Sequence, residues 1–271
     1  MDLRKFLDFN IPIPVPYGIV PPHGGIKLIG SESGREVLAY FDPKERHARP
    51  LTKHNPIKGL YPANKDLHLL YEHLQNDDVL IVIVDGFFGT GKTSTVMAHA
   101  IANLKQDSGF RIYLTKPHVP VGRTYGHLPG DLEEKTDPEF ESFYQYFERY
   151  SQLRLDLLKL EGRVNTAPLE YIRGRDFINA WVIVDEAQNL TKEEAITIAS
   201  RVADGSKLIL IGDSSPWQKD IKKESGLTFL LDLLMGEHIV GHTELKTVEH
   251  VLRGTVAKTL LKALTKKGHA L

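Results

Sequence analysis

The sequence predicts an α/β fold, in which helices flank a mostly parallel central sheet. The first observation is a set of continuous apolar runs of strand length, at 79–84, 181–184 and 207–211. Such runs are typical of parallel strands that are buried on both faces. The second observation is that helical patterns separate the runs, as parallel strands require a crossover connection. The length of 271 residues suits one large domain, or one domain with an appendage.

Composition limits the classes of function. The net charge is −1, so no global field draws the chain onto nucleic acid, and any such contact must come from a local patch. The sequence contains no cysteine, which excludes disulfides, cysteine nucleophiles and thiolate metal sites. No apolar run reaches the length of a membrane span, and the first ten residues carry charges where a signal peptide would be apolar. We therefore expect a cytoplasmic protein without a membrane partner.

Residues 1–59 differ from the rest and are expected to form an N-terminal extension. Five prolines lie within 11–22, which favours extended chain over helix. Two short apolar segments, 26–29 and 36–41, flank a glycine- and serine-containing turn and predict a β-hairpin. The segment 44–58 is rich in Lys, Arg and His and suits either a contact with nucleic-acid phosphates or an ordinary solvated loop, the commoner case.

The next segment leads into a phosphate-binding motif. Leucine and tyrosine spacing predicts a helix over 64–75, which Asn64 could cap. The strand at 79–84 then runs into GFFGTGKTS at 86–94, a P-loop followed by a helical pattern. Its glycines allow the backbone N–H groups to turn toward phosphate, and the helix N-terminus adds positive potential. The residues predicted to bind nucleotide here are Gly86, Phe87, Phe88, Gly89, Thr90, Gly91, Lys92, Thr93 and Ser94.

Two residues of this motif have distinct predicted roles. Lys92 would reach the β- and γ-phosphates of the nucleotide, and the Thr93 hydroxyl would hold Mg²⁺.

A second strand is predicted at 110–115, followed by a loop-like stretch at 116–138 that is rich in glycine and proline. Aromatic and leucine side chains then recur at helical spacing and predict one or two helices over 139–161. An aromatic stripe of this kind is usually core, and it could stack on bases only where it is exposed.

The apolar run at 181–184 ends in two acids. A buried parallel strand would deliver Asp185 to the sheet edge that faces the P-loop, where it would bind Mg²⁺ through water. Glu186 would orient and deprotonate the attacking water. Thr191 begins a capping box and a helix to about residue 203.

The run at 207–211 ends at Asp213, which, with Gln218, is a candidate for sensing the γ-phosphate. The remainder, 221–271, reads as helical around two leucine clusters.

Several blocks together resemble the PhoH-type group of ATPases. Beside the P-loop these are HLPGDLEEK at 127–135, PLEYIRGR at 168–175 and VDEAQNLT at 184–191, and the resemblance extends from about 60 to 264. It implies a RecA-like P-loop domain over 60–271 that hydrolyses ATP with Mg²⁺. A compact, stand-alone member, of the sort also found in phages, is the expected type.

The resemblance also implies roles for further residues. Gln188 or Gln218 would report loss of the γ-phosphate. Phosphoryl transfer also needs a positive group, for which Arg173, Arg175 and Arg201 are candidates. In RecA-like rings the neighbouring subunit supplies this arginine, so a ring-shaped homo-oligomer such as a hexamer is expected.

Three uses of the nucleotide stay open. One is work on RNA or single-stranded DNA, such as unwinding or remodelling. Another is a nucleotide-gated assembly module with weak hydrolysis. A small-molecule kinase is the third, and the DEAQN block disfavours it.

Overall fold

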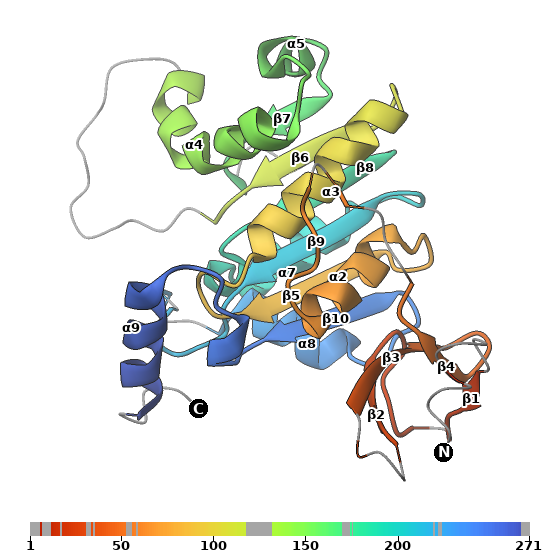
Figure 1. Cartoon of the computed structure of the whole chain (residues 1–271). Helices are drawn as coiled ribbons and strands as arrows, with labels where there is room; N and C mark the ends of the chain where they lie inside the picture. Colours follow the sequence, from red (N-terminus) through yellow and green to blue (C-terminus); the bar gives the residue numbers. More distant parts are fainter. Residues whose placement is uncertain are drawn as a thin grey trace.

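A six-stranded parallel sheet forms the centre of the computed structural model (Figure 1). The structure describes residues 6, 12–16, 18–30, 34, 36–52, 56–57, 59–117, 132–169, 174, 176–218, 220–221 and 224–266. The strands of the sheet are β10 (Val240–Leu245), β5 (Ile81–Gly86), β9 (Lys207–Gly212), β8 (Ala180–Val184), β6 (Arg111–Thr115) and β7 (Val164–Thr166), in that spatial order. This confirms the predicted sheet, and insertion of β9 between β5 and β8 gives the RecA-like order.

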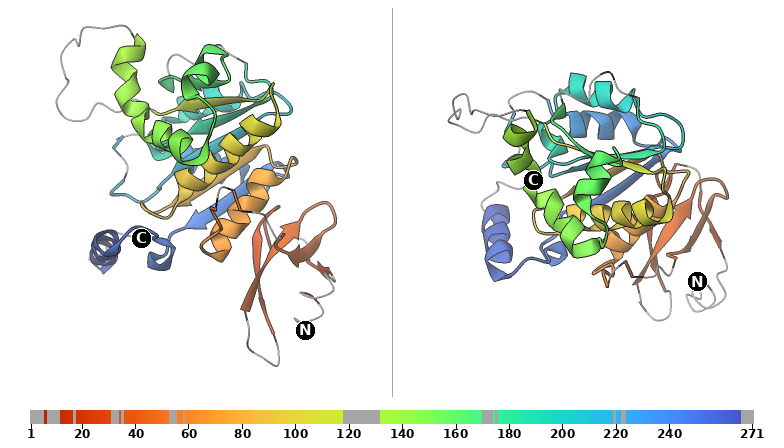
Figure 2. Two further views of the ribbon diagram at one scale, coloured as in Figure 1. Left: turned by 45° about the horizontal axis from the view of Figure 1, so that its top comes forward. Right: turned by 90° about the horizontal axis from the view of Figure 1, so that it is seen from above.

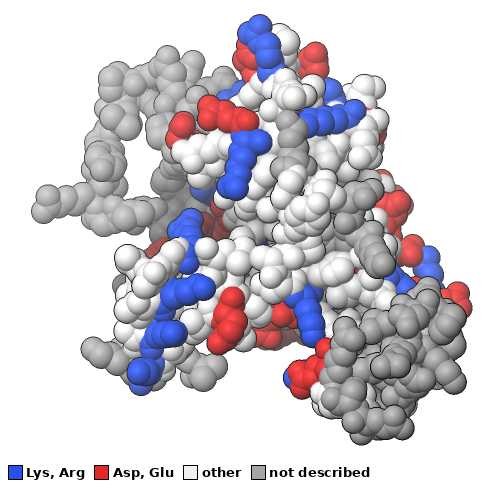
Figure 3. Space-filling view, in the orientation of Figure 1, with Lys and Arg blue, Asp and Glu red and all other residues white. Residues whose placement is uncertain are grey.

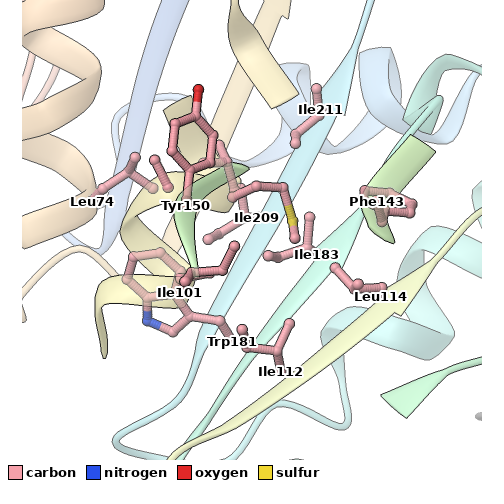
Figure 4. Close-up of a cluster of buried hydrophobic side chains, with 14 of the residues drawn as sticks. Leu74, Ile101, Ile112, Leu114, Phe143, Tyr150, Trp181, Ile183, Ile209 and Ile211 are labelled. Atoms are coloured by element: carbon pink, nitrogen blue, oxygen red, sulfur yellow. The ribbon is translucent and has the colours of Figure 1, made fainter. Parts of the chain in front are cut away.

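Helices cover both faces of the sheet (Figure 2). On one face lie α2 (Lys65–Gln75), α3 (Lys92–Gln106) and α4 (Leu132–Tyr150), and on the other α7 (Lys192–Ala199) and α8 (Gly226–Leu234). Side chains alternate accordingly, since Val82 and Val84 of β5 join the first core cluster and Ile83 joins the second. Figure 4 shows the first cluster, where Ile209, Ile211 and Ile183 of adjacent strands meet Ile101 of α3.

Helix starts follow the predicted capping residues. The side chain of Asn64 accepts a hydrogen bond from the amide of Leu67 at 2.8 Å, and Thr191 and Glu194 form the expected capping box. The short helix α5 (Leu155–Leu160) follows α4, and α9 (Thr255–Lys266) lies outside the helical layers beside the end of β10 (Figure 1). Within the described part of the chain, no helix is long and apolar enough to cross a membrane.

A second, four-stranded antiparallel sheet precedes the parallel one. Its order is β1 (Ile13–Pro14), β4 (His47–Pro50), β3 (Glu36–Asp42) and β2 (Gly25–Ile29). The antiparallel pair of β2 and β3 confirms the predicted hairpin. It packs on the main body through buried Tyr40, whose hydroxyl accepts a hydrogen bond from Asn76 at the end of α2 at 2.9 Å.

The basic segment is partly a strand rather than a loop, because β4 lies within it. Its described cations are engaged inside the chain: Arg49 contacts Glu72 at 2.8 Å and lies 4.2 Å from the centre of the Tyr40 ring, and Lys44 contacts Asp78 at 2.7 Å. Of the cations that the structure describes in this segment, Lys44 and Arg49 are therefore already paired within the chain.

Three further predictions are corrected. The stretch 116–138 is not all loop, because α4 begins at Leu132; residues 118–131 lie outside the described residues. Strands β7 and β10 were not predicted as strands. Both are edge strands, and the sequence of β10, VGHTEL, carries exposed Glu244 and partly exposed His242 instead of an apolar run.

Candidate nucleotide site

The P-loop connects the carboxyl end of β5 to the N-terminus of α3. Gly89 and Gly91 adopt positive φ angles of 74° and 91°, which curl the loop around the start of the helix. The ammonium of Lys92 donates hydrogen bonds to the carbonyl oxygens of Gly86 at 2.5 Å and Phe87 at 2.9 Å. This arrangement holds a cation and a helix N-terminus at one point, which suits an anion such as phosphate.

Burial lowers the pKa of Lys92, and the surrounding carboxylates of Asp213, Asp185 and Glu186 oppose this shift. The amide of Phe87 donates to the carbonyl of Leu245 in β10 at 3.0 Å, so that amide belongs to the sheet connection. The Ser94 hydroxyl lies 2.6 Å from the hydroxyl of Tyr150.

Thr93 and Asp185 come together as the metal prediction requires. The Thr93 hydroxyl donates to a carboxylate oxygen of Asp185 at 3.4 Å, and Asp185 directly follows β8. Burial raises the pKa of the Asp185 carboxyl, Glu186 raises it further, and Lys116 and Lys92 lower it. One hydroxyl and one carboxylate beside a phosphate site form a donor set that fits Mg²⁺, which keeps most of its ligands as water and phosphate oxygen. Among the described residues there is no ready-made cluster of three or more His, Asp or Glu for a metal.

Glu186 is held in an unusual backbone conformation. Its φ of 56° lies in the left-handed region, which a non-glycine residue rarely adopts, and its side chain is exposed. The carboxylate accepts a hydrogen bond of 2.6 Å from the amide group of Gln188. The same nitrogen donates to the carbonyl of Gln218 at 3.2 Å, and the Gln188 oxygen accepts from the amide of Asp213 at 3.1 Å. Gln188 thus joins the loops after β8 and β9.

Asp213 follows β9 and faces the same region. One of its carboxylate oxygens accepts from the amide of Ser215 at 3.0 Å, and the other is buried without a hydrogen-bond partner. Burial raises the pKa of Asp213. A buried acceptor without a donor is uncommon in folded proteins, and it marks a position where a ligand group or water could bind.

Sequence reasoning missed four residues that complete this edge of the sheet. Asp85 of β5 is 1% exposed and contacts the ammonium of Lys246 at 2.6 Å, and both contact the hydroxyl of Ser214, at 2.7 and 2.6 Å. A fourth, Lys116, lies 4.0 Å from Asp185. The signal was positional: Lys116, Ser214 and Lys246 all lie at or just after the ends of parallel strands, but β10 was not recognised.

An aromatic cluster supports the loop from the other side. The rings of Phe87 and Trp217 stack with centroids 6.0 Å apart, and Phe87 packs with Val251 and with Leu261 of α9. Phe88 is partly buried against the same cluster. The two phenylalanines of the loop therefore dock the C-terminal segment onto the P-loop.

Of the predicted arginines, Arg201 is the one that the structure describes, and it lies away from this edge. Arg201 sits near the amino ends of the strands, where its backbone bonds Phe177 and its guanidinium lies 3.6 Å from Asp176. Within one chain it does not reach the P-loop. Arg173 and Arg175 lie outside the described residues.

The chain is similar in sequence to proteins of Bacillus subtilis. Protein PhoH2 of Bacillus subtilis (strain 168) is 34% identical over 218 residues, which cover 76% of this chain and 48% of that protein. A PhoH-like protein of the same organism is 37% identical over 226 residues, covering 82% of this chain and 69% of that protein. The chain thus spans about half the length of the first relative.

Solved structures resemble the chain only distantly. Unliganded Pif1 from Bacteroides sp. aligns with a TM-score of 0.34 and 14% identity, over 72% of this chain and 43% of that one. Domain 2 of the DEAD-box helicase Mss116p, bound to an RNA duplex, aligns with a TM-score of 0.35 and 13% identity. The alignment covers 70% of this chain and 79% of that one.

The sequence model described as "PhoH-like protein" matches residues 60–265, a span that contains the P-loop and every described side chain of the site above. The chain therefore belongs to the PhoH-like protein family, and its main domain has the P-loop nucleotide-binding fold.

Proposed function

We propose that this protein hydrolyses ATP with Mg²⁺. One observation carries the proposal: the Lys92 ammonium, the Thr93–Asp185 oxygen pair and the Glu186 carboxylate converge at the carboxyl ends of β5 and β8. Lys92 and the loop amides would neutralise the phosphates, and Thr93 and Asp185 would hold the metal. Mg²⁺ would supply charge neutralisation on the phosphate oxygens. Glu186 would accept the proton of the attacking water.

The test is ATP turnover by the purified chain and two single variants. Lys92→Ala removes the phosphate contact and Glu186→Gln removes only the base, so each is expected to reduce turnover by about a hundredfold or more. Glu186→Gln should still bind ATP, whereas Lys92→Ala should bind it weakly. Removal of divalent metal with a chelator should abolish turnover. Equal turnover by Glu186→Gln and the parent would refute the assignment of the base.

We further propose that hydrolysis is coupled to single-stranded nucleic acid, RNA or DNA, held along α9. Lys258, Lys262 and Lys266 are exposed and recur every fourth residue, which places them about 6 Å apart along one face of the helix. Figure 3 shows Lys and Arg side chains gathered over α9. Within the described chain none of the three has an acidic partner within ion-pair distance, so the stripe is available to phosphate groups.

A triple variant tests this interface. Lys258→Ala, Lys262→Ala and Lys266→Ala together should weaken binding of single-stranded RNA or DNA and reduce the slope of log affinity against log salt by about 2. The matched control removes three lysines elsewhere, Lys27, Lys44 and Lys192, and should leave the slope close to that of the parent. If the parent does not bind nucleic acid at low salt, and nucleic acid does not change its ATP turnover, the coupling is refuted and the ATPase proposal stands.

An assembly role has support from a second face of α9. Val256 and Leu260 lie about one turn apart on α9 and are 85% and 52% exposed, and Leu252, three residues before the helix, is 51% exposed. These exposed side chains would suit a neighbouring copy in a ring-shaped homo-oligomer. Sedimentation with and without ATP measures the mass of the protein in solution. An oligomer that Val256→Asp disrupts would support the interface, and a monomer under all conditions would refute it.

A further inference from the structure

The segment that follows β10 crosses directly over the P-loop. The carbonyl oxygen of Gly89 accepts two backbone hydrogen bonds from this segment, from the amides of Leu252 at 2.8 Å and Arg253 at 3.2 Å. The Val251 side chain is buried against Phe87 just before this crossing. The backbone of Arg253 is therefore fixed to the middle of the phosphate-binding loop.

The Arg253 side chain lies along the same loop. A β-carbon added at Gly89 would stand 3.0 Å from the β-, γ- and δ-carbons of Arg253, closer than ordinary contact. Gly89 also has a positive φ, so glycine is required there for its backbone and for the passage of this side chain. The aliphatic part of the Arg253 side chain therefore lies beside the loop at Gly89.

The charged end of Arg253 and the carboxylate of Asp185 both act on the hydroxyl of Tyr146. Burial raises the pKa of the Tyr146 hydroxyl, the negative charge of Asp185 raises it further, and the positive charge of Arg253 lowers it. One phenol therefore senses both Asp185 and Arg253. Among the described residues, the Arg253 guanidinium has no carboxylate within ion-pair distance and no hydrogen-bond acceptor, and the residue is exposed.

We infer that Arg253 is the arginine that stabilises the charge on the transferred phosphate, and that it acts within its own chain. The inference rests on the proposed ATPase function and differs from the expectation of an arginine supplied by a neighbouring subunit. A guanidinium has five donors in a rigid planar arrangement that matches phosphate oxygens. The backbone bonds to Gly89 hold Arg253 at the P-loop of its own chain, so no second subunit is needed to bring a guanidinium there.

Binding of a phosphoryl-transfer mimic tests the role without turnover. ADP alone and ADP with aluminium fluoride are titrated while the fluorescence of Trp217, which stacks on Phe87, is followed. Arg253→Ala should change ADP affinity by less than about threefold and weaken the aluminium fluoride complex by about a hundredfold, and Arg253→Lys should recover part of the loss. Arg111→Ala, an exposed arginine at the start of β6, is the control and should change neither. If Arg253→Ala weakens both complexes equally, or neither, the inference is overturned.

A mixing experiment tests whether the arginine acts in its own chain. Lys92→Ala retains Arg253 but lacks the phosphate contact. Arg253→Ala retains Lys92 but lacks the arginine. A mixture of the two should show only the summed activities of the separate proteins, because no chain in it is complete. Recovery of turnover on mixing would show action across subunits and refute the inference. If Glu186→Gln abolishes turnover while Arg253→Ala has the activity of the parent, this inference fails and the proposed ATPase function stands.

Discussion

The side chain of Gln188 is 1% exposed and uses both ends of its amide. Its nitrogen donates to the Glu186 carboxylate and the Gln218 carbonyl, and its oxygen accepts from the Asp213 amide. Because Glu186 is exposed and sits on a strained backbone, this amide is what fixes its carboxylate. We therefore assign Gln188 a positioning role for the base, in addition to the expected response to γ-phosphate loss.

Replacement of Gln188 by Ala is expected to lower kcat for ATP by about tenfold to a hundredfold, with a smaller change in KM, because the base is no longer oriented. The buried Asp213 amide and Gln218 carbonyl also lose their partner, at about 1–3 kcal/mol. Asn189→Ala is the matched control, since Asn189 makes a similar pair of hydrogen bonds to Asp220 outside the site. Thermal unfolding and steady-state kinetics of both variants separate the effects. Similar kcat losses in the two variants would show that general loosening, and no specific positioning, is the cause.

Asp213 provides a second test at the level of one residue. Its folded-state pKa is raised, so the folded protein holds the proton more tightly than the unfolded chain does. Stability therefore falls as pH rises from the ordinary aspartate pKa of 3.8 to the raised value, and the penalty is constant above it. At pH 7, Asp213→Asn should be more stable than the parent by about 1–3 kcal/mol and should unfold at a higher temperature. Its ATP turnover should fall. Scanning calorimetry at neutral and acid pH measures this difference. If Asp213→Asn were stabilised as much below pH 3.8 as at pH 7, the electrostatic cause would be contradicted.

The residues found from sequence all follow a strand that could be recognised. Lys92, Thr93 and Asp185 follow apolar runs whose strand character is unmistakable, so the edge of the sheet they reach can be predicted. Lys246 and Arg253 follow β10, which is too polar to be recognised. Asp85 was visible at the end of its strand, but its role depends on Lys246, a partner 161 positions later in the chain.

At the scale of elements, α9 is held by very few contacts. Leu261 is the only residue of this helix that is buried, and it packs on Phe87 and Val251 beneath the P-loop. The helix carries the lysine stripe and begins two residues after Arg253. Nucleic acid bound along α9 would therefore act on a segment whose backbone is bonded to Gly89, which offers a direct route for coupling to the nucleotide site.

Leu261→Ala should undock α9 locally, because loss of a buried leucine costs about 2–5 kcal/mol and no other side chain of the helix is buried. Hydrogen exchange of 255–266 should accelerate, and the Trp217 emission should shift to longer wavelength. Leu260→Ala, at the neighbouring and 52% exposed position, should do neither. Unchanged exchange in Leu261→Ala would mean that contacts other than the Phe87 cluster hold the helix.

The elements themselves were predictable in proportion to their burial. β5, β8 and β9 lie inside the sheet, with helices on both faces, and each contains an apolar run of at least four residues. β7 has three residues and β4 reads HARP, so neither has a periodicity long enough to detect. The start of α4 was missed because glycine and proline dominate the residues before 139.

At the scale of the whole molecule, the two sheets meet through buried, uncharged histidines. The His73 ring donates to the carbonyl of His23 at 2.8 Å and lies 3.0 Å from the hydroxyl of Thr243 in β10. His23 in turn donates to the carbonyl of His238 at 2.8 Å and accepts from the hydroxyl of Tyr40. These bonds connect the antiparallel sheet, α2 and the edge of the parallel sheet, and they engage both ring nitrogens of His73.

This junction predicts loss of stability in mild acid. Burial lowers the pKa of His73 to about 3, and nearby His23, His242 and Lys207 lower it further; burial also lowers the pKa of His23. The folded-state pKa values of both histidines lie below the ordinary 6.5. At a pH between the folded-state value and 6.5, the unfolded chain therefore binds more protons than the folded protein does. The contribution to stability is complete above pH 6.5 and is lost progressively as pH falls from 6.5 toward 3. A histidine whose folded pKa is about 3 contributes up to about 1.4 kcal/mol per pH unit, so His73 alone should lower the free energy of unfolding by about 1 kcal/mol between pH 6 and pH 5, and His23 adds to the fall in the same direction.

Urea unfolding at a series of pH values measures this slope. His73→Gln should reduce the slope by the contribution of one histidine, whatever its effect on stability at pH 7.5, because the variant cannot take up the proton. His238→Gln alters an exposed ring whose backbone carbonyl alone takes part in the junction, and it should leave the slope unchanged. A parent slope near zero between pH 6 and 5, or an unchanged slope in His73→Gln, would show that the junction does not depend on keeping these rings neutral. The expected result would make the contact between the two sheets the acid-sensitive part of the fold, separate from the nucleotide site at the opposite ends of the strands.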